Sequence, residues 1–172
     1  YLDLMKSYSI LSVAAIAAAF LVGCTRGAKI TVTGNSDNDI IVKALDVNKY
    51  TVMDTLELGK SGKAVCKVAL EKGQPEFVYL YDGQKKIASL LLERGDKVDV
   101  ILDTLGGYSV SGSDDCVRLE KIETDFKSAS EQMSDLSYDL DRAVTDAEIS
   151  QAKRALGQAY VDYYRSAVKY VL

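Results

Sequence analysis

The spacing of apolar residues changes at Ser113, and this change limits the folds open to the chain more than any other feature. Before Ser113, short apolar runs alternate with polar residues and are separated by glycine-rich turns, a pattern typical of β-strands. After Ser113, apolar residues recur three and four positions apart, which places them on one side of a helix. The sequence therefore predicts a β domain over residues 24–112 and a helical segment over residues 113–172.

The β domain is expected to contain many short strands. They cover residues 28–33, 40–45, 52–58, 64–70, 77–81, 87–92, 98–102 and 108–110. Gly59-Lys60-Ser61-Gly62 suits a hairpin loop, and Asp82-Gly83 suits a tight turn between the two strands that flank it. Many short strands joined by glycine turns favour an antiparallel β-sandwich or an open barrel.

The helical segment is expected to fold back on itself. Its first apolar stripe consists of Leu119, Ile122, Phe126, Ala129, Met133, Leu136 and Leu140. After a break at residues 143–145, Thr145 and Glu148 have the spacing of a capping box, and a second stripe runs on to Tyr170. Matching stripes joined by a short connection predict an antiparallel helical hairpin. Phe126→Ala should cost about 3–5 kcal/mol if Phe126 is fully buried, and less than about 1 kcal/mol if it faces solvent.

The first residues of the chain predict an export signal. Lys6 precedes an apolar run over residues 10–22, and a small residue stands before the expected cleavage point. The run is shorter than the ~20 residues that a transmembrane helix needs. Residues 1–23 are therefore expected to be a signal peptide, with Met5 as the natural initiator.

The end of this signal resembles the signal-peptidase motif of bacterial lipoproteins. The motif consists of Leu21, Val22, Gly23 and Cys24. The resemblance implies that Cys24 becomes the lipid-bearing first residue of the mature protein and binds it to a membrane. We therefore expect an exported chain, lipid-anchored in the cell envelope. The segment after Cys24 has no acidic run, which favours the side that faces the periplasm.

Two further cysteines are expected in the β domain and at the helix start. Cys66 lies in an alternating run and is predicted to be a small core residue, while Cys116 follows Asp114 and Asp115. An oxidising compartment would allow Cys66 and Cys116 to form a disulfide, and the sequence leaves this pairing open. The chain contains no Cys-x-x-Cys, so it carries no thioredoxin-type redox centre of its own.

The sequence shows no arrangement of residues that indicates catalysis. Histidine is absent, which removes the commonest general base and metal ligand. Asp37 and Asp39 are expected in a turn, and Asp114 and Asp115 at a helix start, where negative charge complements the exposed amides. No metal site, cofactor or enzyme activity is predicted for this chain. A net charge of -4 without a basic stripe also argues against nucleic-acid binding.

Tyrosine is the one enriched residue type that could form a binding surface. Tyr79 and Tyr81 fall on one face of their strand, and further tyrosines crowd the last helix. A platform for carbohydrate or peptide is one reading. Packing with the hydroxyl group at the surface is the more frequent use of tyrosine.

Several segments together resemble one family of exported bacterial proteins. The segments are Asp54-Thr55-Leu56-Glu57-Leu58 with Gly62-Lys63-Ala64-Val65-Cys66, then Pro75-Glu76-Phe77-Val78-Tyr79-Leu80, then Leu91-Leu92-Glu93-Arg94-Gly95-Asp96-Lys97-Val98, and finally Tyr108-Ser109-Val110-Ser111-Gly112-Ser113. Their order and spacing are similar to those of domain-of-unknown-function family 4369, typical of lipoproteins of Bacteroidota. Ala64 replaces the aromatic residue usual in that family.

The resemblance implies a role for the chain as part of a larger protein. In that family, the β domain and a helical linker commonly precede a thioredoxin-like thiol-disulfide oxidoreductase domain with a Trp-Cys-x-x-Cys centre. We therefore expect a non-catalytic N-terminal accessory module that tethers such a domain in the envelope, with the chain truncated before that domain. The alternative is a stand-alone envelope lipoprotein that binds a ligand or a protein partner.

Overall fold

The computed structural model describes residues 27–103 and 106–170, which form a β-sandwich followed by two helices. The strands are β1 (Gly27–Thr33), β2 (Ile40–Asp46), β3 (Lys49–Leu56), β4 (Lys63–Ala69), β5 (Glu76–Asp82), β6 (Lys85–Leu92), β7 (Lys97–Leu102) and β8 (Tyr108–Ser111). The helices are α2 (Asp114–Arg142) and α3 (Asp146–Val168). The predicted change from strands to helices at Ser113 is confirmed.

Two four-stranded sheets make up the β domain. Sheet A has the order β4-β1-β7-β8, and sheet B has the order β3-β2-β5-β6. Buried residues of both sheets form one hydrophobic core between them, so the architecture is a sandwich and not an open barrel. The pairing within the sheets is antiparallel except between β1 and β7, which run parallel. No local turn determines this pair, because β1 and β7 lie far apart in the sequence.

The core follows from the alternation of apolar residues along each strand. In β2, Ile40 and Val42 are fully buried, whereas Ile41 and Lys43 lie on the opposite face. Each such burial contributes about 1.5–3 kcal/mol. The largest fully buried side chains are Ile30, Ile40, Leu80, Leu90, Leu92, Val32, Val42, Val68, Val78, Val98, Val100 and Cys116.

The loop from Gly59 to Gly62 was expected to close a hairpin, and this prediction is wrong. It joins β3 of sheet B to β4 of sheet A, so it carries the chain from one layer of the sandwich to the other. The Gly62 carbonyl accepts a hydrogen bond from the Gly34 amide at 2.8 Å, which ties the loop to the end of β1. The turn at Gly83 does close a hairpin, because β5 and β6 pair in the same sheet.

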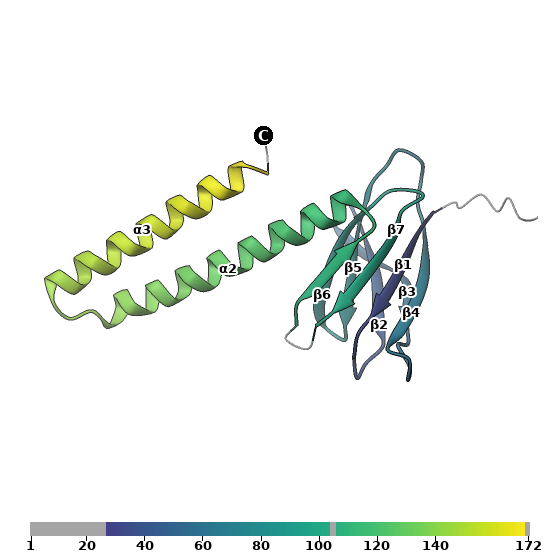
Figure 1. Cartoon of the computed structure of the whole chain (residues 1–172), viewed down its shortest axis with the longest axis horizontal. Coiled ribbons are helices and arrows are strands. Elements are labelled where there is room, and N and C mark those ends of the chain that lie inside the picture. The colour runs from purple at the N-terminus through teal and green to yellow at the C-terminus, as the bar shows by residue number, and fades with distance from the viewer. Residues whose placement is uncertain (1–26, 104–105, 171–172) are drawn as a thin grey trace, which may run out of the picture.

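The helices form the predicted antiparallel hairpin, which extends away from the sandwich like an arm (Figure 1). We call α2 and α3 together the helical arm. The capping box is confirmed: Thr145 Oγ1 accepts a hydrogen bond from the Glu148 amide at 3.2 Å, and Glu148 Oε2 accepts one from the Thr145 amide at 2.9 Å. Within the described residues, no helix is both long and apolar enough to cross a membrane.

The apolar stripes of the helical arm are only partly buried, and Phe126 is not in a closed core. Phe126 is 55% exposed and makes an edge-on contact with Tyr163, whose ring centre is 5.9 Å away. Ala159 is the buried apolar residue of α3. Two helices can cover only one side of each other, so residues at the margin of their seam stay in contact with water.

Candidate functional site

The residues predicted to carry the lipid signal lie outside the described part of the chain. They are Met5, Leu21, Val22, Gly23 and Cys24. Lipid attachment to Cys24 therefore stays a prediction.

The other two cysteines are buried thiols and do not form the disulfide that the sequence left open. Cys66 points inward from β4, as predicted, and burial together with the nearby Asp54 carboxylate raises the pKa of its thiol to about 11. Cys116 is fully buried in the sandwich core, and its Sγ donates a hydrogen bond to the Leu91 carbonyl at 3.2 Å. Burial raises the pKa of the Cys116 thiol as well. Neither thiol has the exposure or lowered pKa of a reactive cysteine.

The two acidic pairs have structural positions. Asp37 and Asp39 lie in the turn between β1 and β2, where Ser36 Oγ donates a hydrogen bond to the Asn38 carbonyl at 2.8 Å. Asp114 and Asp115 occupy the first turn of α2, as expected. Across the described residues, no group of three or more Cys, Asp or Glu side chains is placed to hold a metal ion.

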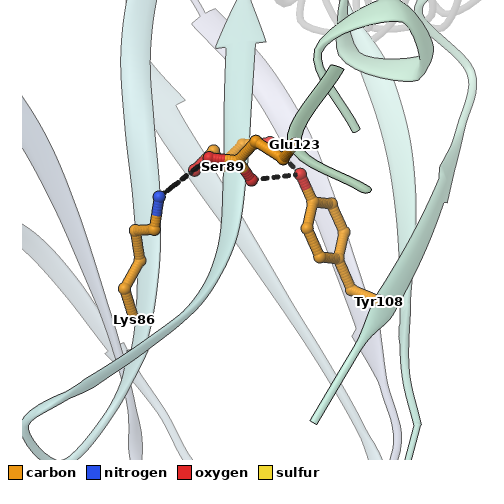
Figure 2. A network of polar contacts seen from close by, with 4 residues as sticks. All are labelled: Lys86, Ser89, Tyr108 and Glu123. Atoms are coloured by element: carbon orange, nitrogen blue, oxygen red, sulfur yellow. Dashed lines mark hydrogen bonds and ion pairs between the residues drawn. The ribbon is translucent and has the colours of Figure 1, made fainter. Parts of the chain in front are cut away.

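A polar cluster fixes the start of α2 to the sandwich, and we call it the joint. It consists of Lys86 and Ser89 of β6, Tyr108 of β8 and Glu123 of α2 (Figure 2). Glu123 Oε1 accepts hydrogen bonds from Lys86 Nζ at 2.8 Å and from Ser89 Oγ at 2.7 Å. Glu123 Oε2 accepts one from the Tyr108 hydroxyl at 3.0 Å. One carboxylate of the helix thus binds both sheets, because β6 belongs to sheet B and β8 to sheet A.

The electrostatics of the joint favour an ionised carboxylate and a neutral phenol. Burial alone would raise the pKa of Glu123, but the hydrogen bonds from Lys86, Ser89 and Tyr108 outweigh it, so this pKa is lowered. Burial and the charge of Glu123 raise the pKa of Tyr108. The cluster is therefore a charge-assisted hydrogen-bond network around an ionised carboxylate.

The chain turns into α2 at a position where only glycine fits. Gly112 has a φ of +94°, and a Cβ atom there would lie 2.0 Å from the Lys97 carbonyl oxygen. This close approach brings the helix start against the sandwich edge, where Cys116 enters the core. Gly112, Cys116 and the joint together attach the first turns of α2 to the β domain.

A cleft of about 420 Å³ lies beside the joint, between α2 and the edge strands. Its charged lining mixes both signs: Lys86, Lys127, Glu120, Glu123, Asp103 and Glu131. In its lining, the Thr124 hydroxyl donates a hydrogen bond to Glu120 Oε1 at 3.3 Å, one turn away on the same helix. The contacts described at this cleft attach the helix to the sandwich.

The outer side of sheet B carries a second surface, which we call the aromatic face. It consists of Tyr50, Phe77, Tyr79 and Tyr81, with Lys43 beside them. The Tyr50 ring meets the rings of Tyr79 and Tyr81 edge-on at 5.6 Å and 6.1 Å between centres. Tyr50 and Phe77 are 48% and 42% exposed, and Lys43 Nζ lies 3.9 Å from the centre of the Tyr81 ring. The predicted shared face of Tyr79 and Tyr81 is confirmed.

Sequence reasoning missed the joint entirely. Its members are far apart in the chain, and each has an ordinary local role as a strand or helix surface residue. No local signal could have found them, because Glu123 shares no motif with Lys86 or Tyr108. Only the contact of α2 with β6 and β8 brings these side chains together.

Comparison with known proteins yields no family. No protein-family model matches the chain, and no curated protein matches it. Among solved structures, the C-terminal domain of AlgF from P. aeruginosa is a distant match. It shares 20% identity at a TM-score of 0.32, over 50% of this chain and 94% of that one.

Proposed function

We propose that this chain is a non-catalytic spacer module, lipid-anchored through Cys24 in the cell envelope and facing the periplasm. Its sandwich would stand next to the membrane, and its helical arm would hold a partner domain at a fixed offset from the sandwich. Following the resemblance to domain-of-unknown-function family 4369, that partner is a thioredoxin-like thiol-disulfide oxidoreductase domain.

The rigid attachment of α2 is the observation that carries this proposal. The first turns of α2 are fixed by Cys116 in the core and by Glu123 in the joint. The remaining turns extend away from the sheets (Figure 1). A helix of 29 residues is about 44 Å long at 1.5 Å per residue, and α3 returns along it. A domain that follows residue 172 would therefore start near the base of the arm, and the hairpin would hold it at a fixed offset from the sandwich. Helix α3 packs along α2, and just beyond the end of α3 the Tyr170 hydroxyl donates a hydrogen bond to Asp125 near the base of α2.

Removal of the lipid site tests the anchoring. Each buried methylene of an acyl chain contributes about 0.8 kcal/mol, so several chains hold a protein firmly on a membrane. We expect Cys24→Ser to move the chain from the membrane fraction to the released fraction, while the neighbouring control Thr25→Ser leaves it in the membrane. A Cys24→Ser chain that still sediments with membranes would exclude anchoring through this residue.

The reading frame of the gene beyond codon 172 tests the partner domain. A frame that continues into a Cys-x-x-Cys sequence would support a tethered redox domain. A stop codon directly after Leu172 would exclude a tethered domain and favour the second candidate function.

The second candidate is a stand-alone envelope lipoprotein that binds a ligand or protein partner. The exposed aromatic face favours it, since Tyr and Phe side chains on a rigid sheet provide stacking area with few rotatable bonds. Tyr79→Ala with Tyr81→Ala should abolish capture of such a partner from envelope extracts. Tyr138→Ala, which removes an exposed tyrosine of the helical arm, should leave capture unchanged.

A further inference from the structure

Strand β3 forms an edge of sheet B and is exposed along most of its length. Among the described residues it pairs with β2 on one side only. Tyr50, Val52 and Met53 are 48%, 58% and 38% exposed. An eight-residue edge strand with exposed apolar side chains is a template on which another strand can pair.

The other three sheet edges are covered or carry repeated charge. Helix α2 contacts both β6 and β8, which form the edges on one side of the sandwich. The β4 edge presents Lys63 and Lys67, and lysine is a common protection against strand pairing. Strand β3 instead carries one residue of each sign, Lys49 near its start and Asp54 near its end.

A β-bulge places these two charges on the same face of β3. Lys43 of β2 pairs with Val52, and Val42 pairs with Asp54, so Met53 is the extra residue. Because of this extra residue, Lys49 and Asp54 share one face of the strand with Thr51, and Tyr50 and Val52 share the other.

This arrangement makes β3 complementary to a second copy of itself. When two antiparallel β3 strands are centred on Thr51, Thr51 lies opposite its own copy and Tyr50 lies opposite Val52. If the bulged Met53 is skipped in this pairing, as it is in the pairing with β2, Lys49 lies opposite Asp54 at both ends. Opposite charges and aromatic–β-branched pairs are favourable cross-strand neighbours. Centring the pair on Tyr50 or on Val52 instead would leave both charges without an opposite charge across the strands.

We propose that two copies of this chain associate through β3, centred on Thr51, to form one continuous sheet from their two B sheets. The pairing is two-fold symmetric and uses the free edge of β3 in both copies, so it closes at a dimer. It also joins the two aromatic faces through Tyr50. This inference stands independently of the spacer function, because it concerns the edge opposite the joint.

A cysteine at the proposed two-fold axis tests the pairing in cells that make the full chain. Thr51→Cys should form a disulfide-linked dimer under mild oxidation, seen on a non-reducing gel. The matched control is Thr55→Cys on the same strand, whose two copies would lie about 20 Å apart, beyond the reach of a disulfide. The parent chain controls for Cys24, and Cys66 and Cys116 are buried. Absent cross-linking at position 51, or equal cross-linking at both positions, would overturn the proposal.

Charge exchange tests the register. In the Thr51→Cys background, Lys49→Asp alone and Asp54→Lys alone should each reduce the cross-linked fraction at least several-fold. The two changes together should restore it, because each pair again has opposite charges.

A second measurement covers the case in which Thr51→Cys does not accumulate. A zero-length carbodiimide cross-linker applied to the unmodified full chain should join the Lys49 amine to the Asp54 carboxylate of another copy. Mixing ¹⁴N- and ¹⁵N-labelled chains separates links between copies from links within one chain by mass. Finding no mixed-isotope link between these peptides would overturn the proposal.

Discussion

Val47 has an unusual backbone conformation for its residue type. It stands first in the two-residue loop between β2 and β3 and has a φ of +52°, the left-handed region. A β-branched side chain is disfavoured there, because Cβ comes close to the following carbonyl oxygen. Val47 is also 93% exposed, so no packing compensates for this strain.

We expect Val47→Gly to stabilise the protein. Removing the left-handed strain should raise the free energy of unfolding by about 1–2 kcal/mol. The greater conformational freedom of glycine in the unfolded chain should lower it by about 0.5–1 kcal/mol. The net rise of about 0.5–1 kcal/mol in the free energy of unfolding can be measured by urea denaturation. Val144→Gly is the matched control, since Val144 is an equally exposed loop residue without a positive φ and should gain nothing. A loss of stability in Val47→Gly would contradict the strained backbone.

Glu123 makes the stability of the joint depend on pH. Its pKa is lowered in the folded protein, so its contribution to stability is fully present above the ordinary glutamate value and is lost as the pH falls through the lowered value. We expect Glu123→Gln to reduce the free energy of unfolding by about 1–2 kcal/mol at pH 7, and by clearly less at pH 3.5.

Urea denaturation of both chains at the two pH values measures this difference. Glu131→Gln removes an exposed carboxylate of the same helix and controls for the change in net charge. A difference between the wild type and Glu123→Gln that is the same at both pH values would show that Glu123 is not held in its ionised form by the joint.

Individual elements follow from local patterns, whereas their partners do not. The alternation in β2 and the three-and-four spacing after Ser113 are local, and the strands and helices appear within a few residues of where these patterns predict them. The largest shift is in β3, which spans Lys49–Leu56 where residues 52–58 were predicted. The connection from Gly59 to Gly62 has glycines suited to either a hairpin or a crossing between sheets. Which of the two forms depends on the distant pairing of β1 with β4 and β7. The joint could not be predicted for the same reason: it depends on a contact between distant segments, and nothing near Glu123 in the sequence indicates that α2 will lie against β6.

The helical hairpin gives a test at the scale of one element. Phe126 is partly exposed and meets Tyr163 edge-on, so Phe126→Ala removes an aromatic pair and leaves no closed cavity. We expect a loss of about 1–2 kcal/mol, well below the cost of truncating a fully buried phenylalanine. Thermal or urea unfolding measures it, with Tyr138→Ala as the exposed control on the same helix. A loss above about 3 kcal/mol would mean that Phe126 is more deeply packed than the hairpin allows.

The whole molecule combines two parts whose stability has different origins. The sandwich has a continuous apolar core drawn from both sheets. The helical arm has few buried residues beyond Cys116 and Ala159 and depends on its seam and on its attachment to the sandwich. A spacer function requires that this attachment fix the direction of the arm. Gly112, Cys116 and the joint are the features that provide it.

The distance between the sandwich and the tip of the arm tests this requirement most directly. Spin labels at Glu71→Cys on the sandwich and Asp141→Cys at the arm tip, in a Cys24→Ser background, report it by pulsed electron paramagnetic resonance. Both labelled positions are exposed, and the buried Cys66 and Cys116 should stay unlabelled. We predict one narrow distance distribution that broadens in Glu123→Ala and stays narrow in Glu131→Ala. A broad distribution in the parent chain would contradict the rigid arm, and so would an unchanged distribution in Glu123→Ala.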